Sequence, residues 1–558
     1  MVIKICLNED LEFDNKCKNE NFYVSDSCID INICEEQIDI VLYFDSATFE
    51  LNKLSYAFYG REFLLSDSPC SYKCKYGFMY PFSMITFLYK DKGVTYIVDK
   101  AVIDEIELVK NEHECYFKYS LANKIDSKIE LKKYIHSNRY TDGIDKYQRW
   151  YCEKYGGLPE SEKKLQNVYH VKRYYFHDNF CDSHILGKNE ILLNKIYKDD
   201  CQYLGGIDLG LLFDFAYNPQ NNIRCGNVDA ISFDKQLLKL LNEQITMLNN
   251  CLFFGYFDPY LIQENSELDQ EYRSRLPILK ENGEMRHIWD YKQWAPCVGD
   301  EIWKNYSVKY LQSLVNELAL DGIYLDEFGN GTQYHCYDKK HSHGADFSQF
   351  EAEYNFISTM KNSISEKYWM CEFPPSDCRA NHFNIVLSDT RTLINIYRFV
   401  FPKLKFVRII GCDYPLGDNA WDLNLSFFNG EALWIDNDIH DKKWYPDHIK
   451  KIIKEQYFIL KKYSDFFTSE EVEALFYRSE DGIVINYFAY GNEVVLTYLN
   501  TSENDISKEL NFDNLIFVKN LYSGAEMSHI ESGKILMKIK KQSVGCGLFQ
   551  KITPLQAL

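Results

Sequence analysis

Residues 321–331 of the chain read DGIYLDEFGNG, the pattern expected at the end of a strand in a parallel barrel. An apolar run ends abruptly in two acids, Asp326 and Glu327, and a glycine-rich loop follows. In a barrel of parallel strands, residues at the carboxyl ends of the strands face the active site. Successive side chains of a strand point to opposite sides, so only one of the two acids can face a pocket directly. We predict that this acid is Asp326.

The sequence on both sides of this stretch, from about residue 167 to 437, alternates short apolar runs with amphipathic helices. Such alternation is typical of βαβ units and a parallel sheet. Seven or eight units in about the usual length favour a (β/α)8 barrel. The predicted strands are Val168–Phe176, Cys251–Phe257, Gly322–Asp326, Tyr368–Phe373, Asn384–Asp389, Lys405–Ile410 and Ala432–Asp436.

The two ends of the chain have a different pattern, in which apolar and polar residues alternate with the period of β-strands. Hairpin signals occur at Asp481-Gly482 and Gly491-Asn492. The predicted fold class is therefore a multidomain α/β plus all-β protein, with a central (β/α)8 barrel between two β-domains. Its predicted parts are an N-terminal β-sandwich (1–140), a linker helix (141–165), the catalytic barrel (166–465) and a small antiparallel C-terminal β-sandwich (466–558).

Composition limits the classes of partner and compartment. The 558 residues include 62 Lys and Arg against 82 Asp and Glu, a net charge of −20, which disfavours binding to nucleic acid. The N-terminus lacks a signal peptide and no run has membrane-spanning length, so we expect no membrane partner. The 18 cysteines include no CxxC pair and indicate reduced thiols in a cytoplasmic protein, unless a signal was removed. The oligomeric state stays open.

A second acid follows the next predicted strand. Residues 368–374 read YWMCEFP, so a hydrophobic run meets Glu372 and a proline then ends the strand. Neighbouring strands lie about 5 Å apart. Two carboxyl groups at adjacent strand ends can reach the separation of roughly 5 to 5.5 Å that a retaining glycosidase needs. Either acid alone could equally cap a loop or pair with a basic residue.

The segment 297–331 resembles the barrel core of a group of bacterial glycosidases. This group includes the endo-α-N-acetylgalactosaminidases of glycoside hydrolase family 101, their family 129 relatives and related uncharacterised proteins. The resemblance is carried by Cys297, Trp303, Tyr306 and DGIYLDEFGNG. In family 101, a strand ending in aspartate leads into a Gly-Asn-Gly loop, and the following strand ends in the acid/base glutamate. The resemblance implies that Asp326 is the nucleophile and Glu372 the acid/base, and it covers about a quarter of the chain.

Further polar and aromatic residues are candidates for contacts with substrate. Acids that follow strands can accept hydrogen bonds from paired sugar hydroxyls, and an aromatic loop residue can stack on a sugar ring. A structural cap or simple packing explains each of them equally well. The predicted substrate-binding residues are Asp258, Asp290, Trp294, Glu327, Asn330 and Asp389, with Asp208 and Asp214 as weaker candidates.

A loop after the predicted catalytic strand is rich in metal-ligating residue types. It contains His335, Cys336, Asp338, His341 and His343. Histidine and cysteine beside a carboxylate suit zinc, which could activate water or hold the loop. The spacing matches no familiar metal motif, and His-rich loops are usually solvated or in contact with substrate. We therefore expect no metal and no cofactor, although metal binding by this loop stays an open alternative.

These observations predict a retaining glycoside hydrolase that cleaves an α-linked glycan or oligosaccharide by double displacement. The expected partner is a carbohydrate substrate. Two alternatives stay open. One is a non-catalytic carbohydrate-binding or polysaccharide-assembly protein on the same barrel, and the other is a transglycosylase that uses the same acids but excludes water.

Overall fold

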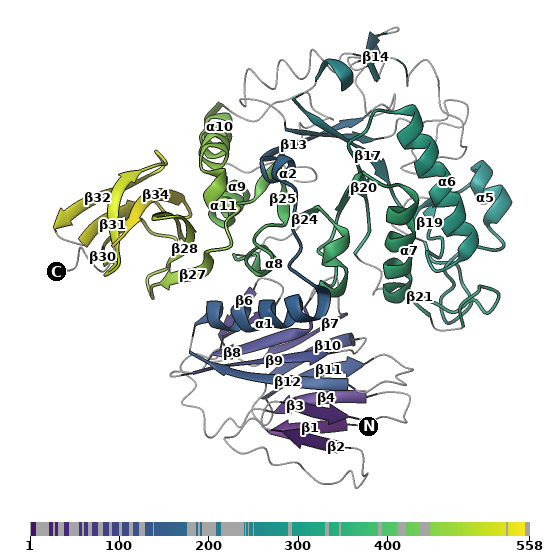
Figure 1. Ribbon diagram of the computed structural model, residues 1–558, viewed down its shortest axis with the longest axis horizontal. Helices are drawn as coiled ribbons and strands as arrows, with labels where there is room; N and C mark the ends of the chain where they lie inside the picture. The colour runs from purple at the N-terminus through teal and green to yellow at the C-terminus, as the bar shows by residue number, and fades with distance from the viewer. Residues whose placement is uncertain are drawn as a thin grey trace. The chain divides into compact units, whose positions relative to one another are not determined.

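The computed structural model describes most of the barrel and C-terminal region and mainly the strands of the N-terminal region (Figure 1). The described residues are 2–6, 22–25, 28–31, 38–43, 55–58, 61–64, 70–75, 82–88, 92–99, 103–110, 115–121, 129–137, 139–175, 186–187, 190–191, 208–213, 239, 242–243, 245–248, 250–287, 293–329, 334–344, 347–388, 393–410, 420–435, 447–531 and 534–552. They form two compact units. The first is Met1–Leu158 with Pro375–Ala380 and Thr392–Val400, and the second is the rest of the chain.

The described residues of the first unit form two β-sheets. One has five strands in the order β1 (Val2–Cys6), β4 (Ile38–Tyr43), β11 (Cys115–Leu121), β10 (Ile103–Lys110) and β7 (Cys70–Lys75). The other has seven, in the order β2 (Phe22–Ser25), β3 (Cys28–Ile31), β12 (Ile129–His136), β9 (Gly93–Asp99), β8 (Met84–Leu88), β5 (Ser55–Phe58) and β6 (Arg61–Leu64). Neighbouring strands are antiparallel except β1 and β4, whose parallel pairing the sequence analysis did not anticipate.

Helix α1 (Tyr140–Tyr155), predicted as a linker, belongs to the first unit and packs on strands β8, β9 and β12 (Figure 1). Its apolar face is aromatic, and Tyr147 and Tyr151 are fully buried. The Tyr147 hydroxyl donates to a carboxylate oxygen of Asp377 at 2.6 Å, and Ser83 donates to the same oxygen through its N–H and its hydroxyl. A segment that follows a barrel strand in the sequence is thereby part of the N-terminal unit's core.

The second unit is built on a closed barrel of eight parallel strands. In barrel order these are β13 (His170–Tyr175), β16 (Leu209–Phe213), β17 (Leu252–Phe257), β20 (Gly322–Leu325), β23 (Tyr368–Cys371), β24 (Ile385–Ser388), β25 (Lys405–Ile410) and β26 (Ala432–Ile435). All strand neighbours are parallel. The predicted barrel is confirmed, and seven of its strands coincide with predicted ones. The eighth, β16, was missed because its short apolar run lies between acids that were read as site candidates.

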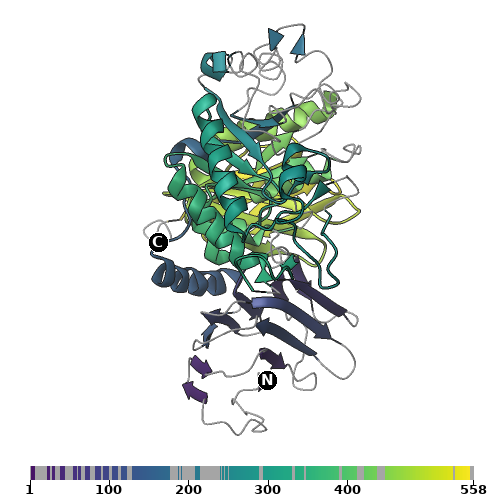
Figure 2. The same ribbon diagram turned by 90° about the vertical axis from the view of Figure 1, so that its right-hand side faces the viewer.

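Helices cover the outside of the barrel. The longest described one, α6 (Glu301–Glu317), begins at Asp300, whose side chain accepts from the N–H of Ile302 at 2.8 Å, and its buried face includes Trp303 and Tyr310. Helix α7 (Gln349–Ser363) packs beside α6, and the two face the viewer in Figure 2. Shorter or later helices of this unit are α2 (Lys163–Gln166), α5 (Glu267–Tyr272), α9 (Trp421–Asn429), α10 (Asp447–Lys462) and α11 (Ser464–Phe467). Helix α8 (Ile396–Val400) and most of the 3-10 helix η2 (Asp377–His382) belong to the first unit.

Within the described part of the chain, three two-stranded sheets lie outside the barrel, and two of them lie in the loops that follow β17 and β20. These small sheets pair β14 (Leu186–Gly187) with β15 (Glu190–Ile191), β18 (Ile262–Gln263) with β19 (Gln293–Trp294), and β21 (His335–Cys336) with β22 (Phe347–Ser348). Both of the latter loops leave the carboxyl ends of adjacent barrel strands. They therefore shape the end of the barrel at which the predicted acids lie.

The C-terminal region adds two further antiparallel sheets to the second unit. One has the order β27 (Val472–Arg478), β28 (Ile483–Tyr490), β29 (Glu493–Asn500), β34 (Val544–Lys551) and β31 (Leu515–Asn520), and the other β30 (Ile506–Asn511), β33 (Lys534–Ile539) and β32 (Ala525–Glu531). The two sheets share one hydrophobic core. Asn486 and Thr497 donate to the carbonyl of Phe428 in α9, which ties this region to the barrel. Within the described residues, no helix combines the length and apolar character needed to cross a membrane.

Candidate active site

Three acids lie side by side at the carboxyl ends of three neighbouring strands. Asp258 follows β17, Asp326 follows β20 and Glu372 follows β23, each one residue after the last paired position of its strand. The ladder continues into the acids, because the N–H of Asp326 donates to the carbonyl of Phe257 at 3.0 Å and that of Glu372 to the carbonyl of Leu325 at 3.0 Å. The strand register therefore places the three carboxyl groups in one row.

The row faces the interior of the barrel. Tyr324 lies two residues before Asp326, and its ring contacts Trp434 of β26 with a centroid distance of 5.6 Å. Strands β20 and β26 lie opposite each other in the closed barrel, so these two rings meet across its interior. Since side chains alternate along a strand, Asp326 points to the same side as Tyr324. Glu372 occupies the equivalent position on the next parallel strand and shares this direction.

Two buried tyrosines hold the Asp326 carboxylate. The Tyr256 hydroxyl donates to Oδ2 and the Tyr324 hydroxyl to Oδ1, each at 2.6 Å. Burial and the nearby charges of Asp326 and Glu372 raise the pKa of Tyr324 well above its ordinary value, so its hydroxyl keeps its proton and acts as a donor. Sequence reasoning missed both tyrosines, although each lies two residues before a predicted site acid and strand alternation could have revealed them.

Glu372 is held in a different environment. Its Oε2 accepts a hydrogen bond from the N–H of Glu327 at 2.7 Å. Burial, followed by the charges of Asp326 and Glu327, raises the pKa of Glu372 well above its ordinary value. The neighbouring negative charges therefore favour the protonated form of Glu372.

The chain turns sharply directly after the row of acids. Glu327 is buried and has a φ of 53°, a left-handed conformation that costs roughly 1–2 kcal/mol in a residue with a Cβ atom. Gly329 has a φ of 100°, and a Cβ atom there would lie 2.7 Å from the carbonyl oxygen of Phe373. The left-handed conformation of Glu327 points its N–H at Glu372, and the conformation of Gly329 brings the loop against Phe373 at the end of the next strand.

Asp258 is also buried among acids. Its Oδ1 accepts from the N–H of Tyr260 at 2.8 Å. Burial and then the charges of Asp326 and Glu327 raise the pKa of Asp258 well above its ordinary value. As a protonated acid Asp258 can donate as well as accept, which suits a hydroxyl-rich ligand.

A further acid, Glu353, comes from helix α7 and was not predicted. Its side chain is fully buried and accepts from the hydroxyl of Tyr260 at 2.9 Å and from the N–H of Gly329 at 3.2 Å. Glu353 thus joins the loop after β17 to the loop after β20. No local sequence signal marks it, because it lies on a helix among ordinary amphipathic positions.

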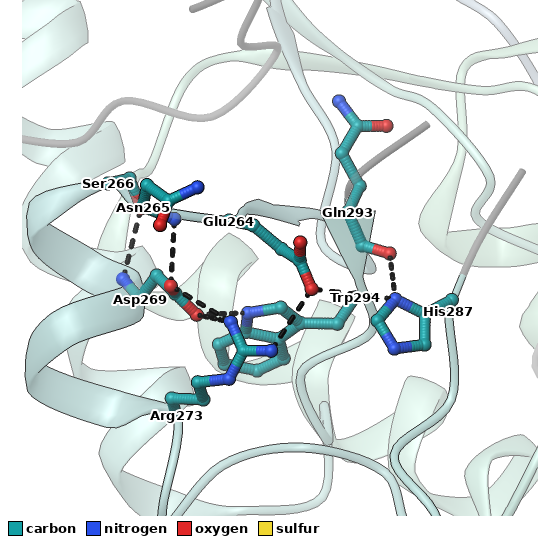
Figure 3. Close-up of polar contacts among 8 residues, drawn as sticks. All are labelled: Glu264, Asn265, Ser266, Asp269, Arg273, His287, Gln293 and Trp294. Atoms are coloured by element: carbon teal, nitrogen blue, oxygen red, sulfur yellow. Dashed lines mark hydrogen bonds and ion pairs between the residues drawn. The ribbon is translucent and has the colours of Figure 1, made fainter. Parts of the chain in front are cut away.

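Trp294, predicted as a sugar platform, is instead enclosed by a polar network in the loop after β17 (Figure 3). Its ring is fully buried, and its indole N–H donates to Asp269 at 2.7 Å. Arg273 bonds both oxygens of Asp269 at 3.1 Å and reaches Glu264 at 3.0 Å. A buried indole presents no face to a sugar in this conformation, so Trp294 supports the loop.

The remaining predicted residues fall elsewhere. Asp290, Asn330, Asp389 and Asp214 lie outside the described residues. Asp208 precedes β16 and accepts from the N–H of Tyr169 at 2.8 Å, so it lies at the end of the barrel opposite the row of acids. Asp208 therefore has a structural role, because it joins the start of β16 to the residue before β13.

Comparisons with known proteins address the fold. Residues 262–368 match a family model described as a domain of unknown function, DUF6259. No curated protein matches the sequence. Among solved structures, the galactosidase domain of an α-galactosidase–sucrose kinase, AgaSK, is similar with a TM-score of 0.59 at 10% identity, over 95% of this chain and 77% of that one.

Two other solved structures are similar. The family 36 α-galactosidase AgaA from Geobacillus stearothermophilus has a TM-score of 0.57 at 10% identity, over 94% of this chain and 77% of that one. The α-N-acetylgalactosaminidase NagBb from Bifidobacterium bifidum has a TM-score of 0.60 at 13% identity, over 84% and 83%. The chain shares the fold of these glycosidases. The similarity extends over most of each chain and therefore includes more than the barrel.

Proposed function

We propose that the protein is a retaining glycoside hydrolase that acts on α-linked sugars, with Asp326 as nucleophile and Glu372 as general acid and then general base. The observation that carries this proposal is the inward-facing pair itself. Two carboxyl groups follow adjacent parallel strands at matching register positions, and one of them, Glu372, has a raised pKa. Adjacent strand ends allow the separation of about 5–5.5 Å that a retaining glycosidase needs, whereas inverting glycosidases hold their carboxyl groups about 6.5–9.5 Å apart to admit a water molecule.

The proposed chemistry divides the roles between the two acids. Asp326 attacks the anomeric carbon while Glu372 protonates the departing oxygen, which yields a glycosyl ester on Asp326 and a free leaving group. Glu372, now ionised, removes a proton from water, and the water oxygen displaces Asp326 from the anomeric carbon. The raised pKa of Glu372 favours the protonated form that the first step requires.

The neighbouring residues support this division. Tyr256 and Tyr324 fix the plane of the Asp326 carboxylate, and the turn at Glu327 holds Glu372 through a backbone N–H. Asp258 lies in the same row and is the proposed contact for a sugar hydroxyl. Asn330 and Asp389 remain proposed contacts from the sequence analysis, since both follow strands of this site.

The similar solved structures suggest which sugars to try first. Their titles name α-galactosidases and an α-N-acetylgalactosaminidase. We therefore propose an α-galactoside or an α-N-acetylgalactosaminide as substrate. Aryl glycosides of both sugars, in both anomeric forms, distinguish these substrates from β-linked ones.

The test combines stereochemistry with variants. Proton NMR of the first product should show the α-anomer, as retention requires. Asp326→Asn should abolish turnover of aryl α-glycosides without loss of fold. Glu372→Ala should remain active on substrates with good leaving groups, and azide should restore its rate by forming an α-glycosyl azide. An initial β-product, or full activity in Asp326→Asn, would contradict the proposal.

Asp389 provides the competing proton donor, because it follows the next strand, β24. If Asp389→Asn rather than Glu372→Ala shows dependence on the leaving group and rescue by azide, the role assigned to Glu372 is wrong. Product analysis with an added acceptor sugar separates hydrolysis from transglycosylation. Binding of a glycan without turnover in the wild-type chain would support the non-catalytic alternative.

A further inference from the structure

Four metal-ligating side chains converge in the loops after β17 and β20. Cys297 lies just before α6, Cys336 lies in β21, and His341 and His343 follow it. One ligand atom from each, namely the two sulfurs, Nδ1 of His341 and Nε2 of His343, lies within 4.8 Å of all the others. Cys336, His341 and His343 lie in the loop whose residue types suggested a metal, whereas Cys297 is distant from them in the sequence.

The distances between these atoms suit a tetrahedral ion. Zinc bonds of about 2.3 Å to sulfur and 2.0–2.1 Å to nitrogen imply spacings of roughly 3.3 to 3.8 Å between ligand atoms. The sulfur of Cys297 lies 3.1 Å from Nε2 of His343, and that of Cys336 lies 3.3 Å from Nδ1 of His341. The two ring nitrogens are 3.2 Å apart. Only small adjustments would bring four bonds onto one ion.

The outer contacts of the histidines fix which nitrogen is available. Nε2 of His341 contacts the carbonyl oxygen of Arg275 at 2.7 Å, and Nδ1 of His343 contacts the carbonyl oxygen of Gly344 at 2.8 Å. A carbonyl oxygen only accepts hydrogen bonds, so both of these outer nitrogens carry the proton. In the neutral rings, the two inner nitrogens then present lone pairs to each other. Metal-binding histidines have this arrangement, in which the outer N–H bonds to a carbonyl and orients the ring.

The two cysteines also have surroundings that suit a metal ligand. Both cysteines are fully buried and neither forms a disulfide. Gln349 donates its amide N–H to the sulfur of Cys297 at 3.2 Å, and the Gln349 carbonyl accepts from the N–H of Val298 at 3.0 Å. This second contact fixes the orientation of the amide, so that its donor faces the sulfur.

We propose that Cys297, Cys336, His341 and His343 bind one Zn²⁺ ion in a closed structural site. Four protein ligands leave no open position for a substrate or water, which distinguishes a structural from a catalytic zinc site. The ion fastens the loop after β17 to the loop after β20. These loops carry Asp258 and Glu327 near their starts, so the ion stabilises the frame of the acidic row without taking part in the chemistry.

Metal content of the full chain tests the proposal. Protein produced in zinc-supplemented medium and freed of loose metal should contain about one zinc per chain by elemental mass spectrometry. Cys336→Ser and His341→Ala should lose most of this zinc. Cys251→Ser, which changes a buried cysteine elsewhere in the barrel, and His335→Ala, which changes the neighbour of Cys336, should retain it. These controls separate loss of a ligand from a general loss of packing.

A measurement on the wild-type chain avoids dependence on variants that fail to fold. Replacement of the zinc by Co²⁺ should produce a sulfur-to-cobalt charge-transfer band and the strong visible bands of a tetrahedral site. Chelation should lower the melting temperature of the wild-type chain. Three results would each overturn the proposal: no zinc or cobalt bound by the wild-type chain, full zinc content in Cys336→Ser, or a Cys297–Cys336 disulfide in peptides of the non-reduced protein. None of these readouts depends on glycosidase activity.

Discussion

Removal of either phenol that holds Asp326 should slow the first chemical step. The variants are Tyr324→Phe and Tyr256→Phe, which both keep the ring. Tyr324→Phe deletes the hydrogen bond to Oδ1 of Asp326, and Tyr256→Phe deletes the one to Oδ2. A hydrogen bond to a charged group contributes about 1.5–3 kcal/mol, which corresponds to a rate loss of about 10- to 150-fold if the bond is needed to position the nucleophile. Tyr324 is 1% exposed and Tyr256 8%, so water can replace the Tyr256 hydroxyl more easily. We expect Tyr324→Phe near the upper limit and Tyr256→Phe near the lower.

The assay is steady-state hydrolysis of an aryl α-glycoside with a good leaving group, because such a substrate needs little help from Glu372. The kcat/KM, which reports this first step, should fall. Tyr498→Phe is the matched control, since this buried tyrosine donates to Asn520 in the C-terminal region at 3.1 Å. An unchanged kcat/KM in Tyr324→Phe, or an equal loss in the control, would refute the assigned role of the phenols.

Two further predictions concern stability. The raised pKa of Glu372 means that the folded chain holds a proton that the unfolded chain releases above about pH 4.3, so this group's stabilising contribution is present below that pH and is lost as pH rises toward the raised pKa. Glu372→Gln should therefore melt at a higher temperature than the wild-type chain at pH 8, and the difference should be smaller at pH 4. Scanning calorimetry at both pH values tests this, and the absence of such a trend would contradict a raised pKa for Glu372 in the folded chain. Gly329→Ala should lower the free energy of unfolding by about 1–3 kcal/mol in urea titrations, because a Cβ atom there is strained by the positive φ and crowded by Phe373. Gly283 has a φ of 82° but open space around it, so Gly283→Ala should lower the free energy of unfolding by less.

The side-by-side placement of Asp326 and Glu372 could be predicted because its signal is local. An apolar strand that stops at an acid marks a strand end, and two such strands in succession place Asp326 and Glu372 side by side in a parallel barrel. Period-two alternation would also have placed Tyr256 and Tyr324 on the same face. The barrel itself followed from the same alternation, apart from the short strand β16.

Other parts of the site depend on contacts that no local pattern records. Glu353 reaches the loop after β20 from helix α7. Cys297 lies beside the other three proposed zinc ligands only because the folded barrel brings its loop next to theirs. Trp294 shows the converse difficulty, because an aromatic residue in a loop has the same sequence signal whether its ring is exposed or enclosed by Asp269 and Arg273. Burial of such residues is decided by tertiary packing.

Covalent trapping can identify the residue that attacks the anomeric carbon, which we propose is Asp326. Incubation with a 5-fluoro α-glycosyl fluoride of the sugar that the chain hydrolyses should add one glycosyl group, and mass spectrometry of the digested protein should locate it on Asp326. The same reagent should leave Asp326→Asn unlabelled. A label on Glu372 or Asp258, or turnover of the reagent's parent substrate with inversion and no label, would contradict the account.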